Sequence, residues 1–236
     1  MSEIGFRIYD KPKKADIDKI KELAQYPAAV ISDVMNRSGC LASEVMPINR
    51  ANKLKVSGRA LTVKTTATDN LMVHKALEMS DKNDIIAVDA RGENNRAIIG
   101  EIMCRLAEKK AVKGFILDGL IRDKDYIQNQ AAVAVYARGC IPQGPYKNGP
   151  GEINVPISCA GQIIYPGDII IGDADGVVAV KKDNLEEVIS KARSKQDQEK
   201  QMLKKIRNGN LKRDWIDKKL QRLGCEIIND NFKIYN

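Results

Sequence analysis

The chain has 236 residues, of which 43% are hydrophobic and only 5% aromatic, and its formal net charge is +8. A core of this composition must be built mainly from Ile, Val, Leu and Ala, which is typical of a parallel sheet covered by helices. No apolar run approaches the roughly 18 residues of a membrane span, the N-terminal segment lacks the apolar region of a signal peptide, and the five dispersed cysteines contain no C-x-x-C pair. We therefore expect a cytoplasmic protein with reduced thiols and no zinc site.

The first predicted helix spans residues 16–23, because Ile17, Ile20 and Leu23 recur on one helical face. Residues 28–39 then indicate a passage from a strand into a helix, with Ser32 or Asp33 as its cap. Asp33 has two interpretations. It is either a plain helix cap or a carboxylate that supports a site nearby.

Residues 55–66 alternate apolar and polar side chains, which predicts a strand. A helix follows from Asp69–Asn70 through Met79, and it carries His74, the only histidine. A single histidine cannot form a His-rich metal site, so we expect His74 to pack or hydrogen-bond beside the core. Residues 84–90 form a second, strongly apolar strand.

The next stretch alternates helices and strands. A helix is predicted over residues 100–110 with Ile99 on its apolar face, and a buried strand over residues 115–118 that ends at the turn signal Asp118–Gly119. A helix over residues 123–129 and a strand over residues 133–137 complete a β-α-β-α-β pattern. Such a pattern implies right-handed crossovers between parallel strands.

This pattern has a geometric consequence, because the loops after parallel strands lie at the same edge of the sheet, where ligands usually bind. Gly100 allows close approach of the backbone, and the free amides of residues 101–103 form an anion site at a helix N-terminus. Arg122 could clamp a carboxylate, and Asp123 could hold a hard divalent cation. The alternative is a surface salt bridge in which Asp123 caps the next helix.

Residues 152–180 are predicted to be all-β, with Asp173–Gly176 as a hairpin turn rather than a calcium loop. Two helices follow, over residues 184–208 and 211–223. Their basic residues alternate with acids at helical spacing, which indicates a solvated face and does not favour nucleic-acid binding. We therefore expect an α/β domain over residues 1–183, and a helical arm over residues 184–236 that packs on a neighbouring subunit.

Several motifs together resemble one family. They are Gly58-Arg-Ala-Leu-Thr-Val63, Gly100-Glu101, Asp118-Gly-Leu-Ile-Arg-Asp123, Ala137-Arg-Gly139, Asn154-Val-Pro-Ile157, Pro166-Gly-Asp168 and Asp173-Ala-Asp-Gly-Val177. Over about residues 25–225 the chain resembles the RraA-like superfamily, and within it the 4-hydroxy-4-methyl-2-oxoglutarate/4-carboxy-4-hydroxy-2-oxoadipate aldolases. The resemblance implies a swivelling β/β/α fold with a C-terminal helical extension. It also implies a homotrimer or homohexamer with sites between subunits.

The resemblance further implies a lyase, a class II pyruvate aldolase dependent on Mg²⁺ or Mn²⁺, which acts on 2-keto dicarboxylic acids and also decarboxylates oxaloacetate. The residues that match the family's site include the metal-binding Asp123 and the pyruvate-binding Arg122. The other matches are Glu101 as an acidic catalytic position, Gly100, Ile102 and Met103 around the pyruvate carboxylate, Lys147 as a substrate contact, Glu199 as an acid that reaches a neighbouring subunit, and Asp33 as a further acidic position.

The same superfamily also contains non-catalytic regulators that bind an endoribonuclease. Those shorter members keep the Arg-Asp pair, so Arg122 and Asp123 do not separate the two functions. Lys147 and the long tail with Glu199 are present here and favour the enzyme.

Overall fold

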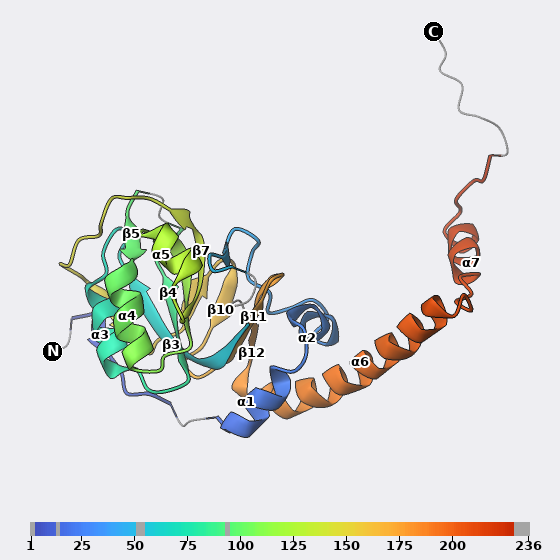
Figure 1. Ribbon diagram of the computed structural model, residues 1–236, viewed down its shortest axis with the longest axis horizontal. Helices are drawn as coiled ribbons and strands as arrows, with labels where there is room; N and C mark the ends of the chain where they lie inside the picture. Colours follow the sequence, from blue (N-terminus) through green and yellow to red (C-terminus); the bar gives the residue numbers. More distant parts are fainter. Residues whose placement is uncertain (1–2, 13–14, 51–54, 93–94, 229–236) are drawn as a thin grey trace, which may run out of the picture. The chain divides into compact units, whose positions relative to one another are not determined.

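The computed structural model describes residues 3–12, 15–50, 55–92 and 95–228. Figure 1 shows the arrangement of its helices and strands. The strands are β1 (Phe6–Ile8), β2 (Met46–Pro47), β3 (Val56–Thr65), β4 (Asp84–Asp89), β5 (Ala97–Ile99), β6 (Gly114–Ile121), β7 (Ala134–Cys140), β8 (Gly151–Ile153), β9 (Ile157–Cys159), β10 (Gln162–Ile164), β11 (Ile169–Asp173) and β12 (Gly176–Val180). The helices are α1 (Ile17–Leu23), α2 (Ala28–Val34), α3 (Leu71–Met79), α4 (Glu101–Lys109), α5 (Lys124–Asn129), α6 (Leu185–Arg207) and α7 (Trp215–Arg222), with a 3₁₀ turn at Lys182–Asn184.

The main sheet is built on parallel neighbours. Strand β4 pairs in parallel with β6, and β6 pairs in parallel with β7, with α4 and α5 in the connections. The predicted β-α-β-α-β unit is therefore confirmed. Every residue of β4 and β6 is buried, because both faces of these strands are covered and their aliphatic runs meet no water.

The two faces of the sheet have different partners. On β4, Ile86 and Val88 belong to the core cluster that includes the buried residues of α3, α4 and α5. The alternate residues, Ile85 and Ala87, point to the opposite face and pack against β9 and β11. Figure 1 shows α3, α4 and α5 together on one side of the sheet, with α1 and α2 beside β11 and β12. The fold is thus mixed α/β, with helices in separate layers around one large sheet.

The Asp118–Gly119 dipeptide does not form the predicted turn, and that prediction is wrong. Both residues lie inside β6, which continues to Ile121 with an irregularity in its pairing to β7 between Leu117 and Leu120. The Asp118 carboxylate accepts hydrogen bonds from Arg138 Nε and from the Ala160 amide. These tertiary partners satisfy an aspartate that would otherwise favour a turn.

Two further predictions of local structure are corrected. Ile99 is part of the short strand β5, which pairs with the end of β6, and it precedes α4 rather than contributing to that helix. Ser32 and Asp33 lie in the last turn of α2 and do not cap it. The helix begins directly after Pro27, and the alanines that follow have high helix propensity.

The chain divides into two compact units, the first reaching Gln196 and the second beginning at Asp197. The first unit therefore extends beyond the boundary expected at residue 183. The reason is that Leu185, Val188, Ile189 and Ala192 of α6 are buried in a core cluster with α1, α2, β11 and β12. In the second unit, α7 has no buried residue. No helix among the described residues is both long and apolar enough to span a membrane.

Candidate active site

The start of α4 and the end of β6 lie directly against each other. The Arg122 amide donates to the Ile99 carbonyl at 2.9 Å, and the Glu101 amide donates to Asp123 Oδ2 at 2.9 Å. A Cβ placed on Gly100 would lie 2.4 Å from Asp123 Oδ2 and 2.8 Å from Arg122 Cγ. The structure thus brings together the two loops that the parallel topology predicted to share an edge. A side chain at residue 100 would displace Asp123 and Arg122 from this contact.

Asp123 adopts the left-handed backbone conformation, with φ +55°. It precedes α5 without capping it, since its side chain forms no hydrogen bond to that helix. The carboxylate turns instead toward α4, with Arg122 Nε 3.7 Å from Oδ2, and both side chains are 41% exposed. A non-glycine residue in this conformation is uncommon and often marks a functional position.

A cavity of about 240 Å³ opens beside Arg122. Its lining comprises Asn70, His74, Ile98, Ile99, Gly100, Ile102, Met103, Arg122, Pro145 and Lys147. The wall is largely apolar and carries a few polar or cationic groups, as is usual for a small-molecule site. Five residues expected to bind substrate therefore line one cavity: Gly100, Ile102, Met103, Arg122 and Lys147.

Backbone hydrogen bonds hold Lys147 at this cavity. The Tyr146 amide donates to the Thr68 carbonyl at 2.8 Å, and the Tyr146 carbonyl accepts from the Asn70 amide at 3.1 Å. On the other side of Lys147, the Asn148 amide donates to Asp69 Oδ2 at 2.6 Å. Lys147 is therefore placed beside the beginning of α3 by contacts with residues far away in the sequence.

Two further residues line this cavity without having been predicted as site residues, Asn70 and His74. Asn70 is buried, donates from Nδ2 to the Ile98 carbonyl at 2.8 Å, and leaves Oδ1 without a hydrogen-bond partner. His74 lies one helical turn further, and burial together with the positive charge of Lys147 lowers its pKa. The spacing of four residues places both side chains on one helical face. This spacing was the one sequence signal that could have grouped Asn70 with His74, although it does not reveal what this helical face contacts.

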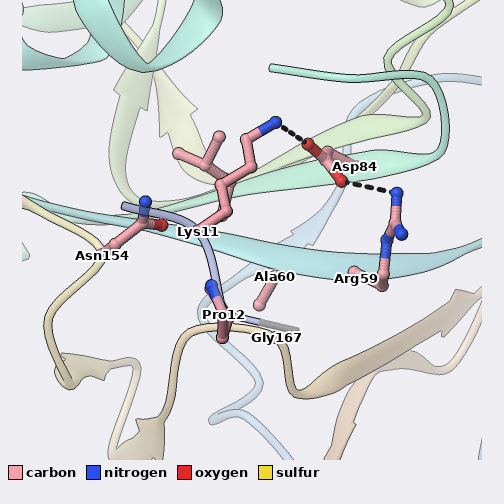
Figure 2. A pocket seen from close by; sticks show the side chains of 8 residues that line it. Lys11, Pro12, Arg59, Ala60, Asp84, Asn154 and Gly167 are labelled. Carbon is pink, nitrogen blue, oxygen red and sulfur yellow. Dashed lines mark hydrogen bonds and ion pairs between the residues drawn. The ribbon is translucent and has the colours of Figure 1, made fainter. Parts of the chain in front are cut away.

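A second cavity lies at the start of β4, where Asp84 forms ion pairs with Lys11 at 2.9 Å and Arg59 at 3.1 Å (Figure 2). Asn154 also lines it, and the cavity measures about 20 Å³. This volume is that of one water molecule. The cavity cannot admit a substrate, so the one beside Arg122 is the better candidate.

Comparison with known proteins identifies the family. A model of the RraA-like family, described as Aldolase/RraA, matches residues 28–179. The chain belongs to the RraA-like family. A relative from Halalkalibacterium halodurans, named "Putative 4-hydroxy-4-methyl-2-oxoglutarate aldolase", is 40% identical over 185 residues, which cover 78% of this chain and 86% of the relative.

Two solved structures share the fold. An uncharacterised protein from Pseudomonas syringae superposes with a TM-score of 0.75 at 22% identity, covering 86% of this chain and 94% of its own. The structure titled as the RNA-processing inhibitor RraA from Thermus thermophilus superposes with a TM-score of 0.59 at 26% identity, covering 65% and 92%. The first similarity concerns the fold alone. The second shows that an RraA-like chain described as an inhibitor has this architecture.

The three acidic residues expected in an RraA-like site lie in different parts of the structure. The backbone amide of Glu101 binds Asp123, whereas the Glu101 carboxylate pairs with Arg105 at 2.7 Å. Asp33 lies on α2, pairs with Lys195 at 3.2 Å, and is not among the residues that line the cavity. Glu199 belongs to the part of α6 in the second compact unit. The catalytic roles of these three residues stay predictions.

The donor set beside Arg122 suits a hard divalent cation better than a soft one. The described residues contain no group of three or more His, Cys, Asp or Glu side chains that could hold a metal ion. Asp123 offers a single, half-exposed carboxylate that is oriented by the Glu101 amide. Mg²⁺ commonly binds through one or two carboxylates and takes its remaining ligands from water and substrate. The residues present therefore fit such an ion.

Proposed function

We propose that this RraA-like chain is a divalent-metal-dependent pyruvate aldolase. It would cleave 4-hydroxy-4-methyl-2-oxoglutarate and similar acids, and also decarboxylate oxaloacetate. The observation that carries the proposal is the close packing of Arg122 and Asp123 against Gly100 at the mouth of a cavity with a second cation, Lys147. The name of the Halalkalibacterium halodurans relative supports the same reaction.

Both reactions share one intermediate. In the aldol cleavage, the 4-hydroxyl group loses its proton and the C3–C4 bond breaks. The electron pair of the broken bond forms the enolate of pyruvate. C4 becomes the carbonyl carbon of the second product. In the decarboxylation, the C3–C4 bond of oxaloacetate breaks with loss of CO₂ and leaves the same enolate. Protonation at C3 then gives pyruvate in both cases.

Each residue has a role in this scheme. Asp123 would hold Mg²⁺ or Mn²⁺, which supplies Lewis-acid stabilisation of the enolate charge. Arg122 would place a fixed positive charge at the same oxygen. The first-turn amides of α4, at Ile102 and Met103, would bind the substrate carboxylate, since such amides lack partners within the helix. A water molecule oriented by Glu101 or Glu199 would transfer the protons.

We further propose that the active form is a homotrimer or homohexamer with its sites between subunits. Glu199 motivates this part of the proposal, because the family resemblance implies that this acid reaches the site of a neighbouring subunit. Asp33 would be a further acidic position of the site, with no subunit assigned to it.

The test is pyruvate release from 4-hydroxy-4-methyl-2-oxoglutarate and, separately, from oxaloacetate, with Mg²⁺ and with excess EDTA. We expect release that needs the metal and is lost in Arg122→Ala. Lys109→Ala serves as the control, because it removes an exposed cation from the far end of α4.

The alternative function is a non-catalytic regulator that binds a ribonuclease, which the structure titled as the Thermus thermophilus inhibitor makes worth testing. No release above the background of the metal alone from either acid would overturn the aldolase proposal. A pull-down with a ribonuclease would then decide on the alternative.

A further inference from the structure

The segment over residues 144–148 borders the cavity beside Arg122, since Pro145 and Lys147 line it. At one end, a Cβ on Gly144 would lie 2.8 Å from Arg122 Nη1, so this glycine lies directly against the guanidinium group. The Gly144 carbonyl also accepts a hydrogen bond from Arg96 Nη1 at 2.7 Å. Arg96 in turn stacks on the Tyr146 ring, 4.1 Å from its centroid, and donates to the Tyr146 hydroxyl at 2.9 Å. Arg96 therefore binds this segment both through the Gly144 backbone carbonyl and through the Tyr146 side chain.

At the other end, Lys147 lies between two anchored residues beside the start of α3, where His74 faces the same cavity. Pro145 and Tyr146 separate Gly144 from Lys147, so the Cα atoms of Gly144 and Lys147 lie about 10 Å apart at most. Arg122 and Lys147 therefore both line one short cavity. Two cations in one wall suit an acid that carries two carboxylates.

The lining of the cavity carries two cations, of which Arg122 has the Asp123 carboxylate 3.7 Å from its Nε. No acidic side chain is among its lining residues as described, whereas Arg122 and Lys147 both line it. No ion pair with an acidic side chain is found for Lys147 within the described part of the chain, while the nearby Lys75 is paired with Glu78 at 3.0 Å. A buried acceptor without a partner, Asn70 Oδ1, lies in the same wall. A second carboxylate of the substrate would offset the charge of Lys147.

We propose that Lys147 and His74 together bind the second carboxylate of a dianionic 2-keto acid, and that His74 takes up a proton when this carboxylate binds. The inference rests on the proposed function for the place of the first carboxylate, beside Arg122. It adds a specificity-determining residue, His74, and a dependence of substrate choice on pH.

The electrostatics of the free cavity support the coupling. Burial, and after it the charge of Lys147, lowers the pKa of His74 and favours the neutral ring. Two neighbouring cations are already paired: Lys75 with Glu78 on the same helix, and Arg105 with Glu101 on α4. A carboxylate between Lys147 and His74 would offset the lysine charge and raise the pKa of the imidazole. Binding should therefore strengthen as the pH falls from 8 to 6.

The experiment compares two acids of the same length, 2-oxoglutarate and 2-oxopentanoate, which differ only in the second carboxylate. Their Kd values are measured by calorimetry on the full chain in excess Mg²⁺ at pH 6 and pH 8. We expect 2-oxoglutarate to bind about tenfold more tightly than 2-oxopentanoate at pH 6, since one pKa unit of coupling corresponds to about tenfold in affinity. This advantage should shrink several-fold at pH 8.

Two variants separate the contributions of the residues. His74→Gln keeps a side-chain donor but cannot titrate, so the advantage of 2-oxoglutarate should become independent of pH. Lys147→Met should remove most of the advantage at both pH values. Lys75→Met is the matched control, because it removes a lysine next to His74 in sequence that is already paired with Glu78. It should bind both acids as the wild type does.

Nuclear magnetic resonance gives a direct second measurement, because His74 is the only histidine of the 236 residues. In a histidine-labelled sample, 2-oxoglutarate should raise the titration midpoint of this single signal, and 2-oxopentanoate should not. Equal affinities for the two acids, or a midpoint that 2-oxoglutarate leaves unchanged, would overturn the inference. Selective binding without turnover would remove only the proposed reaction, whereas failure to bind either acid would remove both proposals.

Discussion

Gly100 is the residue on which the packing of the site depends. Its backbone is extended, with φ −155°, so an alanine could adopt the same conformation. The added Cβ would nevertheless press on Asp123 Oδ2 and Arg122 Cγ. Both contacts are to half-exposed side chains that can shift, so the cost would fall on the position of these groups rather than on folding.

We therefore expect Gly100→Ala to lower kcat/KM by about a hundredfold, since a displacement of about 1 Å can have this effect. The free energy of unfolding should change by no more than about 1 kcal/mol, as for most changes outside the core. Steady-state pyruvate release and urea denaturation measure the two quantities. Wild-type activity in the variant would show that the close contact has no functional role.

Asp123 permits a second prediction at the same scale. Asp123→Ala removes the carboxylate proposed to hold the metal, and we expect metal-dependent turnover to be lost. The fold should persist, because this side chain is 41% exposed and contributes nothing to the core. Activity and thermal unfolding are measured together. Asp125→Ala, two residues further on α5, is the control, and retained activity in Asp123→Ala would remove the metal assignment.

At the scale of elements, the strand ends decide where charges are buried. Asp89 is the last residue of β4, is 8% exposed, and pairs in register with Asp118 of β6. Burial raises the pKa of Asp89, and the charge of Asp118 adds to this shift, while hydrogen bonds from the amides of Arg91 and Ser158 oppose it. A carboxyl group whose folded pKa is raised destabilises the fold at high pH. This loss of stability is absent below the pKa of the unfolded state and complete above the pKa of the folded state.

Asp89→Asn should therefore increase the free energy of unfolding at pH 7. Its amide oxygen can still accept the hydrogen bond that Asp89 Oδ1 receives from the Arg91 amide at 3.1 Å. The gain should be smaller at pH 4.5, because the wild-type carboxyl is then partly protonated in both states. Urea denaturation at the two pH values measures it. An increase in the free energy of unfolding that is equal at pH 7 and pH 4.5 would exclude burial of the Asp89 charge as the cause of the stabilisation.

The turn signals show why local patterns failed for some elements. Asp118–Gly119 predicts a turn from its residue types, yet Arg138 and the Ala160 amide bind the aspartate inside β6. The long aliphatic run of β4 was predicted correctly, since burial on both faces needs no specific partner. A dipeptide whose conformation depends on residues 20 and 42 positions away cannot be assigned from its neighbours.

At the scale of the whole molecule, α6 belongs to both compact units, and this division can be tested by truncation. A chain ending at residue 183 would lose Leu185, Val188, Ile189 and Ala192 from the core. Burial of an aliphatic side chain stabilises by about 1.5–3 kcal/mol, so this truncation should lower the free energy of unfolding by several kcal/mol.

A chain ending at residue 196 keeps these four residues and should unfold like the full chain. If Glu199 acts in a neighbouring site, the 196-residue chain should still lose most of its pyruvate release, as should Glu199→Gln in the full chain. Urea denaturation and the pyruvate assay distinguish the outcomes. Full activity in both variants would show that the arm has no catalytic role.

The sequence by itself determined the parallel β-α-β-α-β unit and the meeting of Gly100 with Arg122 and Asp123, because both follow from local periodicity and the handedness of parallel crossovers. The family resemblance added Lys147 as a substrate contact. Only the tertiary structure decided that Asn70 and His74 of α3 line the same cavity. Their place depends on backbone hydrogen bonds between residues 68–70 and 146–148, and contacts across so many residues leave no trace in a local pattern.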